Sequence, residues 1–72
     1  MLAVSQTARF QYGSVLVAVY RNADAGGRAF VDVVIYRRVN GSFRRGANLK
    51  PADLPVLADL LLQAGRHIQA GG

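Results

Sequence analysis

The sequence contains no cysteine, so the chain forms no disulfide and offers no thiolate ligand to a metal. This absence matters because a domain of 72 residues buries only about 60% of the surface of its unfolded chain and is marginally stable. Small domains usually add a disulfide, a metal or a partner subunit. A single histidine cannot hold a metal alone. We therefore expect no metal and no other cofactor, and we expect self-association into a homodimer or a larger assembly.

Acidic residues are scarce: four stand against nine basic ones, which gives a net charge of +5. They show no pairing that suits acid–base catalysis, and no nucleophile has an evident base beside it. The acidic residues are Asp24, Asp32, Asp53 and Asp59. We therefore expect no enzymatic activity, no catalytic residue and no small-molecule substrate.

Eight of the nine basic residues are arginine. Arginine binds phosphate with two parallel hydrogen bonds and stacks on flat rings, which lysine cannot do. The charge therefore favours a polyanionic partner, with nucleic acid first. A positive surface that only aids solubility is the open alternative.

Long apolar runs are absent as well. No run approaches the roughly 20 residues that cross a bilayer, so we expect no membrane association. Residues 1–6 lack both a basic region and a long apolar core, so they do not resemble a signal peptide. These features predict a soluble cytoplasmic protein, with association to a nucleoid as an open alternative.

The first half of the chain has the pattern of β-strands. Residues 1–7 are small and polar, and we expect them to be frayed. Residues 9–21 form one long bent strand or two short ones, with a bulge or bend at Gly13. Residues 22–27 have the composition of a turn. The second main strand covers residues 28–39.

Alternation along residues 28–39 predicts a sheet with one packed face and one open face. The odd positions are almost wholly aliphatic and should meet the core, although Arg37 at the end of that row can reach solvent. The even positions are mixed and should lie on the open face. They are Phe30, Asp32, Val34, Tyr36 and Arg38.

Asn40–Gly41 is a strong hairpin signal, because a type I′ turn needs positive φ at both central residues. Residues 42–49 are then the returning strand, which Gly46 ends or bends. Pro51 suits the first position of a helix and Asp53 suits its first turn. Pro55 lacks an N–H, so either the first turn is 3₁₀ or the regular helix begins nearer Asp53, with Asp53 as the N-cap.

The C-terminal helix has more apolar residues than one face can hold. One stripe should pack on the sheet, and it comprises Leu54, Leu57, Leu61, Ala64 and Ile68. Val56, Leu60 and Leu62 lie outside that stripe, and we predict that they form a dimer interface. Residues 70–72 should be frayed. The order of elements predicts a single α+β domain over residues 1–72, with an antiparallel sheet followed by one helix.

Residues 30–36 (Phe-Val-Asp-Val-Val-Ile-Tyr) and residues 44–54 resemble the transcriptional positive cofactor four family. That family carries an aromatic-Val-Asp-Ile-Arg-Glu-Tyr strand. A basic pair, Gly, two residues, Leu, a cap, Pro, two polar residues and an aromatic then open its helix. The likeness covers roughly residues 14–68 in element order. It implies a twisted, four-stranded antiparallel sheet with one C-terminal helix, a dimer, and binding of single-stranded DNA. Whirly and Pur-type proteins share related architecture and binding.

The chain also departs from the family's pattern. Leu54 replaces the aromatic that opens the helix, and residues 34–35 (Val-Ile) replace the Arg-Glu pair of the strand. The turn at Asn40–Gly41 is tighter, and Pro55 is unexpected. By the resemblance, Arg44 and Arg45 carry over as nucleic-acid contacts, and Phe30 and Tyr36 match the family's strand aromatics.

Arginines and aromatics gather around the Asn40–Gly41 turn, where residues 37–45 hold four of the nine basic residues. Single-stranded nucleic acid binds to a positive groove with aromatic rings on which bases stack. The candidate contacts are Arg21, Phe30, Tyr36, Arg38, Phe43, Arg44, Arg45 and Lys50. Arg37, on the packed face, is the weakest arginine of the cluster.

Each candidate also has a structural reading: the aromatics can pack in a core or an interface, and Arg44 and Arg45 can keep the hairpin soluble. Asp32 on the open face would repel phosphate unless an arginine pairs with it. We therefore predict a protein that binds single-stranded nucleic acid, DNA before RNA, in transcription, replication or recombination. The alternative is a protein-interaction module that assembles through its helix and its open sheet face.

Overall fold

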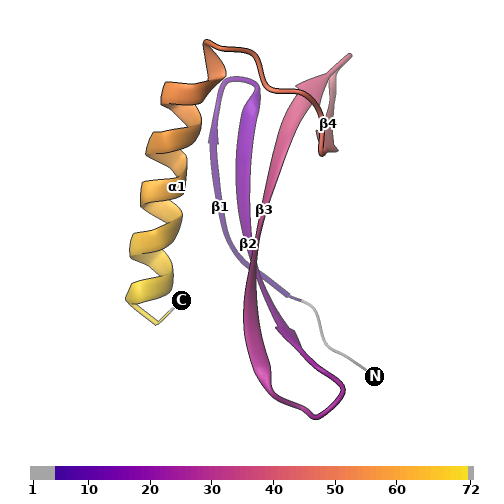
Figure 1. Ribbon diagram of the computed structural model, residues 1–72, viewed down its shortest axis with the longest axis vertical. Helices are drawn as coiled ribbons and strands as arrows, with labels where there is room; N and C mark the ends of the chain where they lie inside the picture. The colour runs from indigo at the N-terminus through magenta and orange to yellow at the C-terminus, as the bar shows by residue number, and fades with distance from the viewer. Residues whose placement is uncertain (1–4, 72) are drawn as a thin grey trace.

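The computed structural model describes residues 5–71, which form one sheet and one helix (Figure 1). The strands are β1 (Ser5–Tyr12), β2 (Val15–Ala23), β3 (Ala29–Val39) and β4 (Ser42–Arg45), and the helix is α1 (Asp53–Gln69). All neighbouring strands are antiparallel, and their order in the sheet is β1-β2-β3-β4. The predicted α+β class, with an antiparallel sheet followed by a C-terminal helix, is confirmed.

The first hairpin resolves the two alternatives for residues 9–21 in favour of two strands. Gly13 has a φ of +58° and occupies the first position of a two-residue loop between Tyr12 and Val15. Glycine at this position, with positive φ there alone, is the pattern of a type II′ turn. Gly13 therefore reverses the chain, and the bulge predicted there is wrong. A register shift lies instead between Gln6 and Ala8.

The described residues near each end of the chain, 5–7 and 70–71, are more ordered than expected. Ser5–Thr7 belong to β1 and are not frayed, because β2 continues far enough to pair with them. Residues 1–4 and 72 lie outside the described residues. Beyond α1, the Ala70 N–H donates to the Arg66 carbonyl and the Gly71 N–H donates to the Ile68 carbonyl, each at 3.0 Å.

The second turn lies later in the chain than residues 22–27. Asn22 and Ala23 still pair with β3, so the reversal begins at Asp24. The Asp24 carboxylate accepts hydrogen bonds from the N–H groups of Gly26 and Arg28, both at 2.9 Å. A side chain that bonds nearby backbone in this way closes a turn without help from the rest of the fold.

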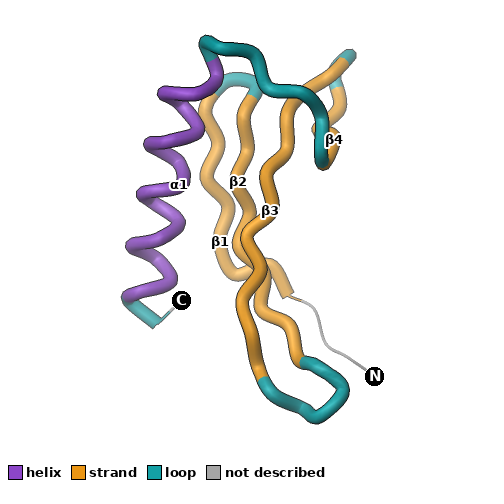
Figure 2. Tube along the Cα trace, viewed as in Figure 1, coloured by secondary structure: helices purple, strands orange, loops and turns teal. Residues whose placement is uncertain are grey.

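The third turn is the predicted one. Asn40 and Gly41 have φ values of +51° and +84°, as a type I′ turn requires, and Val39 pairs with Ser42 across it. β4 then stops at Arg45, before Gly46, whose φ is +75°. The returning strand is therefore shorter than residues 42–49, and Gly46 ends it (Figure 2).

α1 covers only half of the sheet, because it packs over β1 and β2 (Figure 1). The core consists of Val15, Val17 and Val19 from β2 with Leu60 and Ala64 from α1. The odd positions of β3 point to the same side. Ile35 packs against the core as predicted, but Val31 and Val33 are 38% and 42% exposed, since the helix does not reach them.

α1 is rotated relative to the predicted stripe. Leu60 is only 2% exposed and Val56 packs against it, so these two residues belong to the chain's own core. Leu60 has no surface to offer to a second chain. Leu62 is 53% exposed and is the one residue of the predicted interface that faces solvent. Leu54 and Leu61, predicted to pack on the sheet, are 55% and 39% exposed.

The start of α1 combines the two predicted alternatives: a turn of the 3₁₀ type comes first and the regular helix begins at Asp53, but the N-cap is Ala52 and not Asp53. The Asp53 N–H donates to the Lys50 carbonyl and the Leu54 N–H donates to the Pro51 carbonyl, which are the i to i+3 bonds of a 3₁₀ turn. The regular helix then begins at Asp53, with Ala52 before it as the N-cap. Pro55 removes no hydrogen bond from the helix, because the first N–H groups of a helix have no partner within it.

Candidate nucleic-acid interface

The face of the sheet that α1 leaves uncovered is called the open face below. Residues directly opposite each other in antiparallel strands share a face, so the pairing register assigns its members. β1 contributes Gln6, Arg9 and Gln11, and β2 contributes Leu16, Ala18, Tyr20 and Asn22. β3 contributes Phe30, Asp32, Val34, Tyr36 and Arg38, and β4 contributes Phe43 and Arg45.

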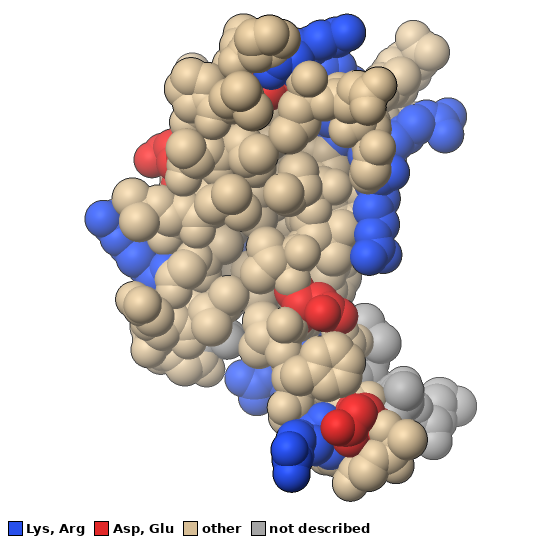
Figure 3. All heavy atoms as spheres, in the orientation of Figure 1, with Lys and Arg blue, Asp and Glu red and all other residues tan. Residues whose placement is uncertain are grey.

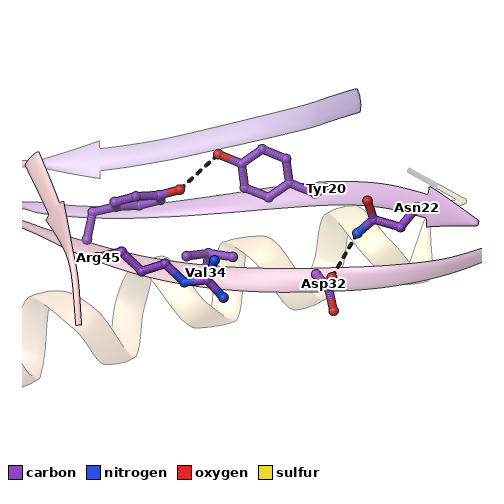
Figure 4. Close-up of a pocket in the computed structure, with 6 residues that line it drawn as sticks. Tyr20, Asn22, Asp32, Val34 and Arg45 are labelled. Carbon is purple, nitrogen blue, oxygen red and sulfur yellow. Dashed lines mark hydrogen bonds between the residues drawn. The ribbon is translucent and has the colours of Figure 1, made fainter. Parts of the chain in front are cut away.

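Two tyrosines meet at the centre of the open face. The hydroxyl groups of Tyr20 and Tyr36 lie 3.1 Å apart, within hydrogen-bond distance (Figure 4). This hydrogen bond, together with partial burial, raises the pKa of Tyr20 above its ordinary value, while Arg9 and Arg45 pull it down. Tyr20 therefore stays neutral at physiological pH. The positive charges of Arg9 and Arg45 both act on its hydroxyl group.

A hollow of about 350 Å³ opens beside these rings. We call it the open-face hollow; it is lined by Tyr20, Asn22, Asp32, Val34, Tyr36 and Arg45. The side chain of Arg45 extends from β4 toward Val34 (Figure 4). At the other end, the Asn22 Nδ2 donates to the Asp32 Oδ2 at 2.7 Å. The hollow thus has a cation at one end and a carboxylate at the other.

Arg38 and Phe43 form a second feature of the open face, at its β4 rim. The Arg38 guanidinium carbon lies 4.9 Å from the centre of the Phe43 ring, which is a cation–π distance. The two residues are directly opposite each other on β3 and β4. The pair presents a flat cation beside an aromatic ring, and both surfaces can stack on a base.

Five of the eight predicted contacts come together on the open face, and they are Phe30, Tyr36, Arg38, Phe43 and Arg45. Arg21 and Arg44 do not join them. Each lies on the α1 side, opposite Val31 and Arg37 respectively. Because successive residues of a strand alternate between faces, these two arginines are separated from the other five candidates.

Lys50 also lies away from the open face, in the segment between β4 and α1. Its N–H donates to the Asp53 Oδ2 at 2.7 Å, and the Arg37 Nε donates to the same oxygen at 2.7 Å. These two hydrogen bonds, that from Arg37 first, lower the pKa of Asp53 below its ordinary value. Arg37 thus ties β3 to the start of α1 and is engaged in the fold.

Arg9, Tyr20 and Asn22 belong to the open face and were absent from the predicted contacts. The feature that could have identified these residues is the register of the first two hairpins. Once the chain reverses at Gly13, Arg9 falls opposite Ala18, and Tyr20 falls opposite Asp32.

Basic side chains gather on the side of the molecule that carries β4 (Figure 3). No group of three or more His, Cys, Asp or Glu side chains that could hold a metal occurs within residues 5–71. Over the same residues, the helix falls short of the length and hydrophobicity needed to cross a membrane.

Comparison with protein-family models, with curated proteins and with solved structures finds no match to this chain. The family likeness seen in residues 30–36 and 44–54 accordingly remains an expectation from the sequence.

Proposed function

We propose that the chain binds single-stranded nucleic acid, DNA before RNA, across its open face. One observation carries this proposal: Tyr20 and Tyr36 lie together on an uncovered sheet between arginines from both outer strands, Arg9 on β1 and Arg45 on β4. Such a face offers stacking surfaces at its centre and phosphate partners at its borders. These are the two elements that sequence-tolerant single-strand binding needs.

Double-stranded DNA fits the molecule less well. A helix that reads a major groove must expose one of its faces to the bases. α1 is the single helix of the described chain, and it buries Leu60 and Ala64 against the sheet. Its basic residues, Arg66 and His67, lie together in its last turn. The open face therefore favours a strand whose bases are already unpaired.

The resemblance to the transcriptional positive cofactor four family supports the same function and suggests a coactivator-like role in transcription. Replication and recombination also generate single strands, so the proposal includes a role in either process. The functional candidates are Arg9, Tyr20, Tyr36, Arg38, Phe43 and Arg45, with Phe30 at the far end of the face.

The decisive experiment is a titration of labelled single-stranded and double-stranded DNA at about 50 and about 200 mM salt. We expect the single strand to bind more tightly. Its affinity should fall with salt, with a logarithmic slope of about −0.7 for each phosphate contacted. The affinity for an RNA strand of the same sequence shows whether the protein prefers DNA or RNA. Absence of single-strand binding at the lower salt concentration would refute the proposal.

A second proposal concerns self-association, because apolar surface remains uncovered on the α1 side of the sheet. Tyr12 of β1 lines a shallow site with Pro55 and Asp59, so that side of α1 faces β1. The opposite side of α1 therefore faces β3. The exposed apolar residues of β3 and α1 on this side are together called the bare flank, and they are Val31, Val33, Leu54 and Leu61.

We infer that a second copy of the chain covers the bare flank and forms a homodimer, leaving the open face free. Leu62 lies next to Leu61 on the outer side of α1 and would border the contact. Light scattering should give twice the chain mass of 7.7 kDa. Leu61→Lys should restore the mass of one chain, whereas Tyr12→Lys, at a residue 70% exposed near the other side of α1, should not. A monomeric wild-type protein at high concentration would rule out the dimer.

A further inference from the structure

The open-face hollow has opposite chemistry at its two ends. Arg45 and Tyr36 stand at one end, and Asn22 and Asp32 stand at the other, with Val34 between them. Asp32 and Tyr36 are four residues apart on β3, which corresponds to about 13 Å at the rise of an extended strand. The volume of about 350 Å³ lies within the range of small-molecule sites. A ligand that fits would carry a negative charge at one end and hydrogen-bond donors at the other.

The hollow contains a carboxylate, Asp32, which phosphate binding does not explain. A carboxylate on a face that binds phosphate repels the nucleic-acid backbone. Its Oδ2 accepts one hydrogen bond from Asn22, and no described residue donates to its Oδ1. An ionised carboxylate accepts about four hydrogen bonds, so Asp32 keeps most of its capacity. Asn22 holds the carboxylate in place, and the unused lone pairs are left for a ligand.

Base edges differ in what they offer to a fixed carboxylate. The Watson–Crick edge of guanine presents two adjacent donors, N1–H and the N2 amino group, which match the two carboxylate oxygens. Cytosine and adenine each place an acceptor beside their one amino group, and thymine places its N3–H between two carbonyl oxygens. These acceptors would face the negative charge of Asp32. In a single strand the edge is free to be read in this way.

We propose that the open-face hollow is a guanine-selective subsite, in which Asp32 accepts from the guanine edge and Arg45 binds the phosphate of the same nucleotide. The inference rests on the proposed single-strand binding and adds a base preference to it. Val34 supplies the apolar floor under the base, and the Tyr20 and Tyr36 rings border it. Asn22 is a positioning residue, because it acts through the carboxylate that it holds.

The test compares short oligo(dT) strands that carry one central dG, dA, dC or deoxyinosine, with affinities measured by fluorescence anisotropy. The dG strand should bind at least about fivefold more tightly than the dA and dC strands, the lower limit for a bidentate contact. Deoxyinosine lacks the N2 amino group and should fall between them. Asp32→Asn should abolish the dG preference and at the same time raise the affinity for plain oligo(dT), because it removes a charge that repels phosphate.

Asp59→Asn is the matched control. Asp59 is exposed on α1, away from the open face, and the substitution changes the net charge by the same amount. This variant should keep the dG preference in full. Equal, tight binding of all four strands would overturn the subsite and leave the proposed function standing. A dG preference that survives Asp32→Asn would overturn the role of Asp32. Failure of every single strand to bind would overturn both proposals.

Discussion

The hydroxyl groups of Tyr20 and Tyr36 lie 3.1 Å apart on neighbouring strands, and their hydrogen bond fixes two aromatic rings at the centre of an uncovered sheet. Both side chains are half-buried, so each ring keeps part of its surface in solvent. The exposed part of each ring is the surface on which a base can stack. The arrangement separates two roles of Tyr36, the hydrogen bond through its hydroxyl and the stacking surface of its ring.

Substitutions at Tyr36 test this separation. Tyr36→Phe removes one hydrogen bond, so the free energy of unfolding should fall by about 0.5–1.5 kcal/mol while single-strand affinity stays near that of the wild type. Tyr36→Ala also removes the ring, so affinity should fall by about 1–3 kcal/mol. Urea unfolding and fluorescence anisotropy measure the two effects. Tyr12→Ala, at an exposed ring on the α1 side, should leave binding unchanged. Equal affinities of the two Tyr36 variants would exclude stacking at this position.

Arg44 and Arg45 offer a matched pair of variants, because these neighbours point to opposite faces of the sheet. Arg45→Ala should weaken single-strand binding at low salt and reduce the salt slope by about 0.7, the value for one phosphate contact. Arg44→Ala removes the same charge and should change both quantities little. The measurement is the salt series for the two variants in parallel. Equal losses would show that net charge, and not the open face, determines affinity.

The sequence predicted those parts of the fold that local chemistry specifies. Asn40 and Gly41 form the expected hairpin because few other residues adopt positive φ without strain. The face of each arginine was harder to predict, since it depends on a register that is set by the length of each turn. Arg44 and Arg45 are both predicted contacts, from the hairpin cluster and from the family resemblance, although alternation along β4 puts them on opposite faces.

The orientation of α1 was ambiguous for a different reason. Two stripes along this helix are apolar, one through Leu57 and Leu61 and one through Val56 and Leu60, and a period of 3.6 residues suits both. In the structure the stripe through Val56 and Leu60 packs on the sheet, because α1 lies over β1 and β2 and leaves part of β3 bare. Which stripe packs on the sheet depends on tertiary packing, and the hydrophobic periodicity of the helix alone does not show it.

Leu60 and Leu62 test the orientation of α1 directly. Leu60→Ala removes a core side chain that is 2% exposed, so the free energy of unfolding should fall by about 2–5 kcal/mol. Leu62→Ala changes an exposed side chain and should cost no more than about 0.5 kcal/mol. Urea unfolding at two protein concentrations measures both effects and reveals any contribution from the proposed dimer. A larger loss for Leu62→Ala at both concentrations would contradict the observed packing.

The ion pair between Arg37 and Asp53 predicts how stability depends on pH. The Arg37 Nε lies 2.7 Å from the Asp53 Oδ2, and this hydrogen bond, followed by that from the Lys50 N–H, lowers the pKa of Asp53 below its ordinary value of 3.8. A carboxyl whose pKa is lowered by folding stabilises the folded state above its ordinary pKa. That contribution should be lost as the pH falls below about 3.8 and through the lowered pKa.

Thermal unfolding of Asp53→Asn at neutral and acid pH measures this contribution. The variant should have a lower Tm than the wild type at neutral pH, because it loses the ion pair between β3 and the start of α1. The difference in Tm should shrink as the pH falls below about 3.8, where the wild-type carboxyl becomes protonated as well. Asp59→Asn removes an exposed carboxylate that forms no salt bridge in the described chain, and it should change the neutral Tm little. A difference between Asp53→Asn and the wild type that stays constant down to pH about 2 would show that Asp53 acts through something other than its charge.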